Sequence, residues 1–591
     1  MAETKLDQTW NLDTFFEGGS QSESFAAFVQ ELKTDIESFI SALNTLSLPA
    51  LPERLNQFAD LSKRMRQASA YVSCLTAQDM ADKKATQLQG QTQVLSASLN
   101  TADLQINQFL SNVPDPEWQN FLATDYGQEV RFPLEEGRLE AKEKLSIDKE
   151  KLISQLSVDG YHGWSQLYNT TVGQMGIEVE LPDEGKRTVS VGQAANLLSS
   201  NNRDVREHVF ERWEKAWTDV ADFCSASINH IAGFRLNVYE QRGWDQVLKE
   251  PLKLNRMSQK TLDTMWEVIT DYKSHLVSYL HKKAELLGVD KLTWADVDAP
   301  ISNVEEKVSY EEACEFIVEQ FSSFNPKMGT FAEHALGNRW VEAEDRAGKR
   351  PGGFCTSFPM SQESRIFMTF SGTASNISTL AHELGHAYHQ HVMNDLNYLN
   401  QHYAMNVAET ASTFAEQIVS DASIRTAESK ERKLQLLEDK LQRAVAFFMN
   451  IHARFLFETR FYEERKNGSV SVERLNTLME EAQKEAFCGE LASYHPSFWE
   501  SKLHFYITYV PFYNFPYTFG YMFSTGIYAR AVEEGASFSD KYDALLCDTG
   551  SMTVEELALK HLGVNLEQRD FWEQACQQIV KDIDLFLELA E

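Results

Sequence analysis

Apolar residues recur at helical spacing along most of the chain. Within residues 22–112 they return every three or four positions, as at Leu32, Ile36 and Phe39, which places them on one face of a helix. This pattern predicts two or three amphipathic helices. The Asn-Val-Pro-Asp-Pro stretch at 112–116 ends the pattern, because these residues favour turns.

Helical spacing resumes near Asn202, whose side chain would cap a helix, and continues to about residue 335. The chain has only 14 Pro and 28 Gly among 591 residues, which favours long helices with few turns. The same periodicity predicts helices over 376–396, 404–425, 428–466, 471–488 and 553–590.

Three segments depart from helical spacing. Ile177–Val191 alternates apolar and polar residues around an Asp-Glu-Gly-Lys turn and predicts two short strands. Glu344–Pro359, rich in Gly, Pro and charge, predicts a loop, and Arg365–Phe370 predicts a short strand after it. The predicted fold class is therefore all-α for the most part, with one or two small β elements.

Charge and cysteine content exclude several classes of protein. With 55 Lys and Arg against 87 Asp and Glu, the net charge is −32, so a nucleic-acid or anionic membrane surface is not expected. The seven cysteines never form a C-x-x-C pair, which disfavours a disulfide framework and a thiolate zinc site. The start, MAETKLDQTW, lacks the basic and apolar regions of a signal peptide. These features predict a reducing, cytoplasmic setting.

One uncharged segment, Phe505–Ala529, needs separate consideration as a possible membrane span. It contains Pro511, Asn514 and Pro516, several Thr and Tyr residues and only scattered aliphatic residues. This composition suits a membrane helix badly. The segment therefore requires another explanation.

The most informative segment is His382-Glu383-Leu384-Gly385-His386, an H-E-x-x-H pattern within a predicted helix. Residues four apart share a helix face, so both imidazoles can reach one zinc ion, and Glu383 can act as general base for an attacking water. Chance would produce the pattern only about 0.06 times in a chain of this composition. The alternative is a charged helix with surface histidines, but this helix is substantially apolar.

A catalytic zinc site keeps three protein ligands and one open position. His389 lies a turn too far along a straight helix to share the metal, so contact with a ligand or with substrate is expected for it. In the metzincin pattern the third histidine ligand lies ten residues after the first, but position 392 of this chain is Val. The third ligand should therefore come from another helix.

Two carboxylates lie on one face of the next apolar helix, at Glu409 and Glu416. Buried carboxylates are costly unless they are paired or bound to metal. We choose Glu409 as the third ligand and Glu416 as the residue that orients a ligand histidine. A salt bridge at a helix interface is the alternative for both, and Asp395 is the other candidate ligand.

The segments HELGHAYHQ and VAETASTFAE, with a glutamate 27 residues after the first histidine, resemble the thimet-type oligopeptidase family, and its oligoendopeptidase F branch in particular. Three further segments support the resemblance, which covers residue 200 to the C-terminus well and 1–195 more weakly. They are GGFCTSFP at 352–359, FSGTASNISTLAHELGH at 370–386 and HFYITYVPFYNFPYTFGYMFS at 504–524. The branch often has an acidic residue where this chain has Asn376.

The resemblance implies that His382 and His386 bind one zinc ion per chain together with Glu409, and that Glu383 activates water. It also implies two mostly helical halves that enclose a deep channel. Such a channel would admit unfolded oligopeptides and exclude folded proteins.

The uncharged aromatic segment gains a role in this setting, because peptide hydrolysis needs donors aimed at the oxyanion. The His and Tyr pair of the family maps best to His504 and to Tyr513 or Tyr517. Tyr506 and Tyr521 could contact substrate, and aromatic core packing is the alternative for about half of the tyrosines. The candidates are His504, Tyr506, Tyr509, Tyr513, Tyr517 and Tyr521.

Two weaker features lie before the metal helix. The Arg365–Phe370 strand could bind a substrate backbone by strand addition, or could be purely structural. Gly352-Gly353 could form a mobile lip of the channel, or simply a turn.

We therefore expect a zinc-dependent endopeptidase that hydrolyses internal bonds of short, unfolded oligopeptides, with no obligate protein partner. The alternatives are a dipeptidyl carboxypeptidase or carboxypeptidase on the same scaffold, or a peptide-binding protein that has lost catalysis. The regions expected are an N-terminal helical region at 1–115, a mixed lobe with a small hairpin at 116–200, and a helical catalytic domain at 201–591.

Overall fold

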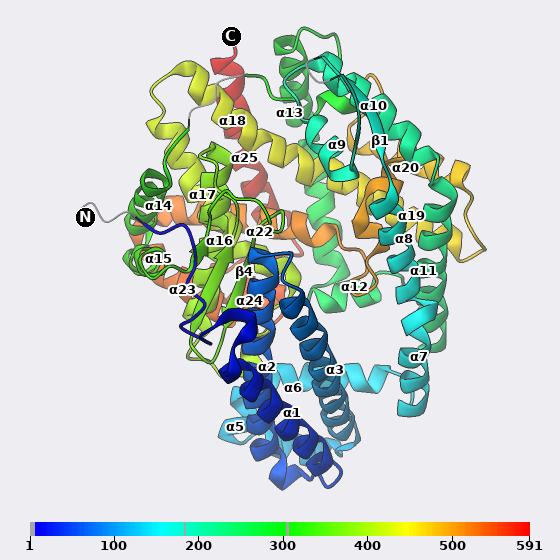
Figure 1. Cartoon of the computed structure of the whole chain (residues 1–591), viewed down its shortest axis with the longest axis vertical. Helices are drawn as coiled ribbons and strands as arrows, with labels where there is room; N and C mark the ends of the chain where they lie inside the picture. Colours follow the sequence, from blue (N-terminus) through cyan, green and yellow to red (C-terminus); the bar gives the residue numbers. More distant parts are fainter. Residues whose placement is uncertain (1–5, 183–184, 303–306) are drawn as a thin grey trace. The chain divides into compact units, whose positions relative to one another are not determined.

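The computed structural model describes residues 6–182, 185–302 and 307–591. Figure 1 shows the chain coloured along the sequence, from blue at the N-terminus to red at the C-terminus. The chain forms two compact units, each built from three segments. Unit 1 comprises 1–144, 305–422 and 530–563, and unit 2 comprises 145–304, 423–529 and 564–591. The division at residues 115 and 200 stays a prediction.

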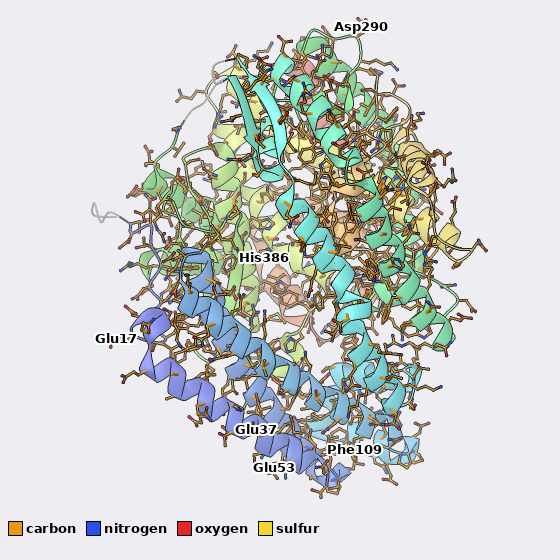
Figure 2. The ribbon with its side chains drawn as sticks, turned by 45° about the vertical axis from the view of Figure 1, so that its right-hand side comes forward. Glu17, Glu37, Glu53, Phe109, Asp290 and His386 are labelled. Carbon is orange, nitrogen blue, oxygen red and sulfur yellow. The ribbon has the colours of Figure 1, made fainter. Side chains whose placement is uncertain are left out.

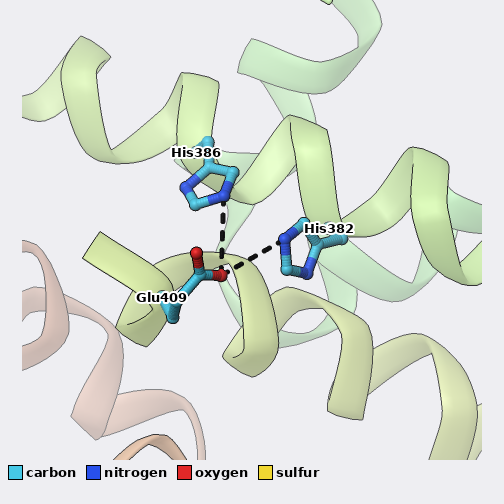
Figure 3. Close-up of side chains that lie close together, drawn as sticks. All are labelled: His382, His386 and Glu409. Atoms are coloured by element: carbon cyan, nitrogen blue, oxygen red, sulfur yellow. Dashed lines mark ion pairs between the residues drawn. The ribbon is translucent and has the colours of Figure 1, made fainter. Parts of the chain in front are cut away.

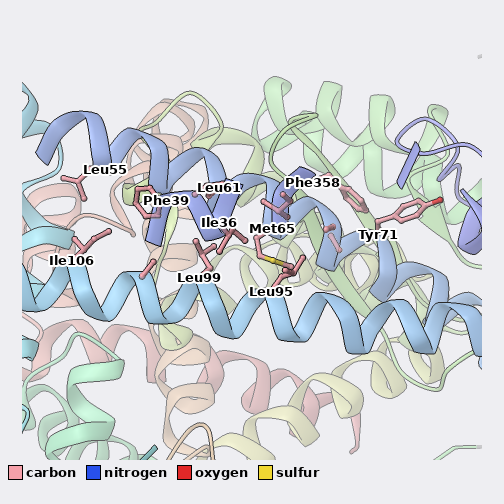
Figure 4. Packing of buried hydrophobic residues seen from close by; sticks show 14 of the residues in the cluster. Ile36, Phe39, Leu55, Leu61, Met65, Tyr71, Leu95, Leu99, Ile106 and Phe358 are labelled. Carbon is pink, nitrogen blue, oxygen red and sulfur yellow. The ribbon is translucent and has the colours of Figure 1, made fainter. Parts of the chain in front are cut away.

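Unit 1 begins with three long helices, as the spacing predicts. They are α1 (Glu23–Leu43), α2 (Leu51–Gln78) and α3 (Lys83–Asn112). Ser22 caps α1 by accepting a hydrogen bond from the backbone N–H of Phe25. The apolar face of α1 is buried against α2 and α3 in one hydrophobic cluster, shown in Figure 4.

Acidic side chains lie on the outer faces of these helices and on the segment before α1. Glu17, Glu37 and Glu53 are exposed and project from this part of the chain in Figure 2. Part of the large negative charge therefore lies in solvent, away from the hydrophobic cluster.

A three-stranded sheet in unit 1 comprises β3 (Val341–Glu342), β4 (Phe354–Phe358) and β5 (Glu363–Phe367), in the order β3-β5-β4. The central strand, β5, is parallel to β3 and antiparallel to β4. Phe358 of β4 joins the cluster of the N-terminal helices (Figure 4). The sheet thus connects that core to the elements of the metal helix, because β4 and β5 also contact α16.

This sheet corrects two predictions. The segment Glu344–Pro359 is not wholly a loop, because it contains β4. The strand predicted at Arg365–Phe370 is shifted to Glu363–Phe367; it pairs with β4 along its length and with β3 at Ile366 and Phe367, and its role in substrate binding stays a prediction.

Nine further helices in the described parts of the chain belong to unit 1, and of these α16 contacts the sheet. They are α4 (Asp115–Leu122), α5 (Asp125–Glu129), α6 (Arg131–Glu143), α14 (Tyr310–Phe324), α15 (Pro326–Gly337), α16 (Ala374–Met393), α17 (Met405–Thr426, in unit 1 to Ala422), α23 (Ser539–Asp548) and α24 (Val554–Leu562).

Unit 2 begins with two helices and the predicted hairpin, β1 (Ile177–Leu181) paired with β2 (Gly185–Val189). Asp183 and Glu184 of the predicted turn lie outside the described residues. The remaining helices are α7 (Ile147–Gly160), α8 (His162–Gln174), α9 (Val191–Leu197), α10 (Arg203–Thr218), α11 (Ala221–Gln241), α12 (Lys249–Leu254), α13 (Gln259–Leu286), α18 (Lys430–Val445), α19 (Ile451–Arg465), α20 (Val472–Ala486), α21 (Phe498–Ser501), α22 (Phe515–Glu534, in unit 2 to Ala529) and α25 (Arg569–Leu589).

Local signals explain several helix ends. Asn202 caps α10 as predicted, by accepting a hydrogen bond from the backbone N–H of Asp204. The stretch predicted as continuous over 553–590 is two helices, because Gly563 adopts a left-handed conformation (φ 65°) that ends α24. The prediction of a largely helical fold is confirmed, since the described residues form only two small sheets. The channel stays a prediction.

Candidate metal centre

Helix α16 carries the H-E-x-x-H segment. Its first turn is fixed by a reciprocal cap between Thr373 and Asn376, in which each side chain accepts a hydrogen bond from the other residue's backbone N–H. Asn376, which departs from the family pattern, therefore helps to begin the helix. His382 and His386 leave the same face of α16, with ring centres 4.8 Å apart and planes at 87°.

Helix α17 places Glu409 opposite the two histidines. Its Oε2 lies 3.3 Å from Nε2 of His382 and 3.7 Å from Nε2 of His386, as Figure 3 shows. One donor atom from each residue lies within 4.8 Å of the other two. Across the described parts of the chain, no second group of His, Cys, Asp and Glu side chains could hold a metal ion in this way.

A glycine allows α16 and α17 to approach closely. A Cβ at Gly385 would lie 2.6 Å from the backbone oxygen of Ala411 and 2.7 Å from Cα of Ser412. The two helix backbones are therefore in contact at this point. Glu409 precedes Ala411 by two residues, so the contact brings its carboxylate within reach of the histidines.

The protonation states of the site suit metal binding. Burial by itself would raise the pKa of Glu409, but a hydrogen bond from His382 and the charges of both histidines lower it to about 2. Burial and the neighbouring His382 lower the pKa of His386 to about 4, although Glu409 opposes this. An anionic carboxylate and a neutral imidazole are the forms in which these side chains bind metal.

Glu383 is the second carboxylate of α16 and is only 7% exposed. Its Oε2 is buried and has no hydrogen-bond partner. Burial raises the pKa of Glu383 to about 7; the charge of His382 opposes the rise and Glu409 adds to it. A carboxyl group with a pKa near neutrality and an unpaired oxygen can accept and return a proton.

Glu416, two turns after Glu409 on α17, contacts the other nitrogen of His382. Its Oε2 lies 3.4 Å from Nδ1, while Nε2 of the same ring faces Glu409. An acceptor at Nδ1 holds the proton there and leaves the Nε2 lone pair free for a metal. Glu416 is predicted to orient a ligand histidine, and that role requires a contact of this kind.

The structure does not bring His389 or Asp395 into the metal group. His389 is fully buried, stacks on Tyr403 at 4.1 Å, and places Nε2 2.8 Å from Oγ1 of Thr549. Its ring therefore packs in the core of unit 1. Asp395 is exposed, just after the end of α16.

In unit 2, His504, Tyr513 and Tyr517 form one cluster of rings. The His504 ring centre lies 5.6 Å from that of Tyr513 and 6.2 Å from that of Tyr517, and the tyrosines are 5.5 Å apart. Nδ1 of His504 is buried without a hydrogen-bond partner. The structure thus brings these three predicted residues together, and their function at the metal centre stays a prediction.

The other tyrosines of the aromatic segment differ from these. Tyr506 is fully buried and stacks on Tyr168 at 3.6 Å, and Tyr521 stacks on Phe447 at 4.5 Å. Both rings contribute to packing, which was the alternative for them. Tyr509 is 80% exposed.

Sequence reasoning missed one feature of the site. A Cβ at Gly353 would lie 3.3 Å from Oε1 of Glu383, so the chain passes close to this carboxylate just before β4 begins. Gly352 has a left-handed conformation (φ 89°), as a turn requires. The GGFCTSFP segment contained the signal, but its glycines and proline favoured a loop.

A helical frame that presents two histidines and a glutamate at one point, with a buried glutamate next to the first histidine, defines the class of metal-dependent hydrolases. Comparisons with known proteins agree. Residues 196–578 match the model of peptidase family M3, and residues 110–176 match that of oligopeptidase F. The chain belongs to peptidase family M3, and it is a metallo-oligopeptidase that hydrolyses peptides.

Individual relatives have low sequence identity to this chain, but the similarity extends over most of both chains. Oligopeptidase PepF of Bacillus subtilis (strain 168) is 23% identical, over 100% of this chain and 88% of the relative. The crystal structure of a protein described as a peptidase, from Chlamydophila abortus, has a TM-score of 0.83 at 18% identity, and the comparison covers 99% of both chains. Oligoendopeptidase-F from Enterococcus faecium has a TM-score of 0.70 at 16% identity, covering 96% of this chain and 98% of its own. These likenesses confirm the predicted fold.

The family implies a metal at the His-His-Glu group. Among the residues that the structure describes, no helix has the length and apolar character that crossing a bilayer requires.

Proposed function

We propose that this protein is a zinc-dependent endopeptidase that hydrolyses internal bonds of short, unfolded oligopeptides. The observation that carries the proposal is the convergence of His382, His386 and Glu409 within 4.8 Å, with the unpaired Oε2 of Glu383 on the same helix. Relatives named oligopeptidase PepF and oligoendopeptidase F support the class of substrate.

The donor set fits zinc. Catalytic zinc sites use three protein ligands, and two histidines with one glutamate are an established combination. Two imidazole nitrogens and one carboxylate oxygen are present here, and a thiolate is not among them. One zinc ion per chain follows, because the described residues form one such group.

Bound zinc would supply a Lewis acid that polarises the scissile carbonyl and makes a nearby water more acidic. Glu383 takes the proton from the attacking water and passes it to the leaving amine, a task for which a pKa of about 7 is well matched. Glu416 holds the ring of His382 in one orientation while this occurs.

The oxyanion of the tetrahedral intermediate requires hydrogen-bond donors. His504 and either Tyr513 or Tyr517 are proposed for this role. Support comes from their clustering in unit 2 and from the buried Nδ1 of His504, which has no hydrogen-bond partner among the described residues.

Strand β4 is proposed to receive the peptide backbone. It is one of the two edge strands of its sheet, paired with β5 alone among the described residues. Gly353, directly before it, lies next to Glu383. A peptide that pairs with this edge would extend the sheet and pass the proposed general base.

We also propose that the protein acts in a reducing compartment, the cytoplasm, without an obligate protein partner. All seven cysteines are free, including the buried ones. Thiols of this kind persist where disulfides are kept reduced.

The test is digestion of a quenched peptide of about ten residues, blocked at both ends, with and without a zinc chelator, followed by mass analysis of the products. Internal cuts that chelation abolishes and zinc restores are expected. Cleavage only of peptides with a free terminus would replace the proposal by an exopeptidase. Full zinc binding with no cleavage of any peptide would indicate a binding protein.

A further inference from the structure

A second group of charged side chains in unit 2 is not used by the proposed mechanism. Arg454 on α19 and Lys502 after α21 both lie against the ring of Phe498. The guanidinium carbon of Arg454 is 5.4 Å from the ring centre, and Nζ of Lys502 is 4.6 Å from it. His504 follows Lys502 by two residues, and the charges of Arg454 and Lys502 both act on it, so three basic side chains lie in this part of unit 2.

These cations have no carboxylate partner. Within the parts of the chain that the structure describes, neither Arg454 nor Lys502 has a carboxylate oxygen within 4.0 Å, and Nε of Arg454 donates instead to the neutral Oδ1 of Asn450, at 2.8 Å. Both side chains are half-buried. The acidic residue that acts on both, Asp298, is exposed and not in contact.

The arrangement is electrostatically unfavourable in the absence of a ligand. Burial and the charge of Arg454 lower the pKa of Lys502 to about 7, and burial together with both cations lowers the pKa of His504 to about 4. Contacts with the face of one ring offset only part of this cost. The chain has 87 acidic residues, yet none is paired with these cations in the described structure.

The neighbours of the cations are residues already proposed to contact substrate. His504 belongs to the ring cluster with Tyr513 and Tyr517, and Tyr517 lies near enough to Arg454 to act on its pKa. A guanidinium offers paired donors that match the two oxygens of a carboxylate, and an ammonium adds a point charge. Peptides supply carboxylates at the C-terminus and on acidic side chains.

We propose that Arg454 and Lys502 form a carboxylate-binding subsite for the peptide substrate. The inference rests on the proposed peptidase function and adds a preference, among its substrates, for oligopeptides that present a free carboxylate to this subsite. The carboxylate is that of the C-terminus or of an Asp or Glu side chain.

The test uses three forms of one fluorescent decapeptide: a C-terminal acid, a C-terminal amide, and an amide with Glu in place of one Gln. Binding to the zinc-loaded full chain is measured by anisotropy in a Glu383→Gln background, which needs no turnover, and kcat/KM is measured with the unaltered chain. A carboxylate-bearing form should bind roughly ten- to a hundredfold more tightly than the neutral amide, as loss of a charge-assisted hydrogen bond would predict.

Arg454→Met and Lys502→Met should each remove this preference and leave binding of the neutral amide within about threefold. Lys502→Arg should retain the preference, because the charge remains. The control is Lys466→Met, at a lysine of unit 2 that pairs with Glu463 away from the cluster. Melting curves identify variants that fail to fold.

Preference for the acid form identifies the C-terminal carboxylate, and preference for the Glu form identifies a side chain; both support the subsite. Equal binding of all three forms by the unaltered protein overturns the proposal without reliance on any variant. A retained preference in both Met variants also overturns it. If no form is cleaved but the preference is present, the peptidase proposal fails and the subsite stands.

Discussion

The metal centre of unit 1 and the ring cluster of unit 2 each contain a histidine whose pKa is held at about 4, but in surroundings of opposite charge. Burial is the main cause in both cases. At His386 the carboxylate of Glu409 opposes the shift. At His504 the cations Arg454 and Lys502 reinforce it.

The comparison separates two properties that a buried histidine can have. Its own charge is set mainly by burial, which favours the neutral imidazole at both sites. The ligand that it can help to bind is set by the neighbouring charges, which attract a metal cation in unit 1 and an anion in unit 2. Variants that alter one neighbour at a time therefore test each site independently.

Removal of Glu409 should have the largest effect, because it takes the only anionic donor from the proposed ligand set. In Glu409→Ala, zinc affinity should fall by more than about a hundredfold, since loss of an outer contact alone costs about ten- to a hundredfold. Peptide hydrolysis should fall to the rate of the chelated enzyme. Zinc content after dialysis and kcat/KM are the measurements.

The control is Glu53→Ala, at an exposed acidic residue of unit 1, which should change neither quantity. Full zinc content in Glu409→Ala would move the third ligand to Glu416.

Glu383→Gln should separate metal binding from catalysis. Gln preserves the shape of the side chain but cannot accept the water proton, so kcat should fall by about 10²- to 10⁴-fold. Zinc content should not change, because Glu383 is not in the donor group. Wild-type turnover in a zinc-loaded variant would end the assignment of Glu383 as base.

Tyr513→Phe and Tyr517→Phe test whether a tyrosine hydroxyl of unit 2 stabilises the oxyanion. Removal of the hydroxyl from the tyrosine that donates to the oxyanion should lower kcat by about 10²- to 10³-fold. The other should cost less than about tenfold. Tyr272→Phe, outside the cluster, provides a control, and steady-state kinetics with circular dichroism is the measurement. Unchanged kcat in both cluster variants would leave the oxyanion role without support.

The metal centre could be predicted further from sequence than the ring cluster, for a physical reason. Helix periodicity alone places His382 and His386 on one face. The donor from the next helix depends on how two helices pack, so residue reasoning chose Glu409 but kept a salt bridge and Asp395 as alternatives, and the family resemblance then implied Glu409 as well. For the tyrosines, packing and donor roles differ only in their tertiary neighbours, which spacing does not reveal.

The same distinction explains the errors in the fold. Amphipathic helices such as α1 were predicted because one face is apolar. Helix α22 was not, because its residues up to Tyr528 are largely buried on every side and give it no distinct polar face there, with Phe515, Phe519 and Phe523 fully buried. Strand β4 was missed because its stability comes from pairing with β5, while the glycines before it favour a turn.

Gly385→Ala tests whether close helix contact positions the third ligand. The added methyl group would meet the backbone of α17 at 2.6–2.7 Å, so α17 must move away. Stability should fall by about 1–3 kcal/mol, as overpacking does, and zinc affinity should fall with it. The matched control is Gly90→Ala in α3, where the methyl group meets nothing within 4 Å. The control should gain up to about 1 kcal/mol. Thermal unfolding of both apo-proteins is compared. Unchanged stability and zinc affinity in Gly385→Ala would show that close helix contact does not position Glu409.

Glu416 should give the smallest effect, because it acts on the metal only through His382. Glu416→Gln keeps an oxygen that can accept the Nδ1 proton, so zinc affinity should fall by about tenfold or less. Glu416→Ala removes the acceptor and should approach the upper end of the ten- to hundredfold range for such contacts. Competition with a chromophoric zinc chelator measures both. The order of the two variants is decisive: equal losses would mean that the negative charge of Glu416, and not its hydrogen bond to Nδ1, supports the metal, which would make the charge of the surroundings as important in unit 1 as it is in unit 2.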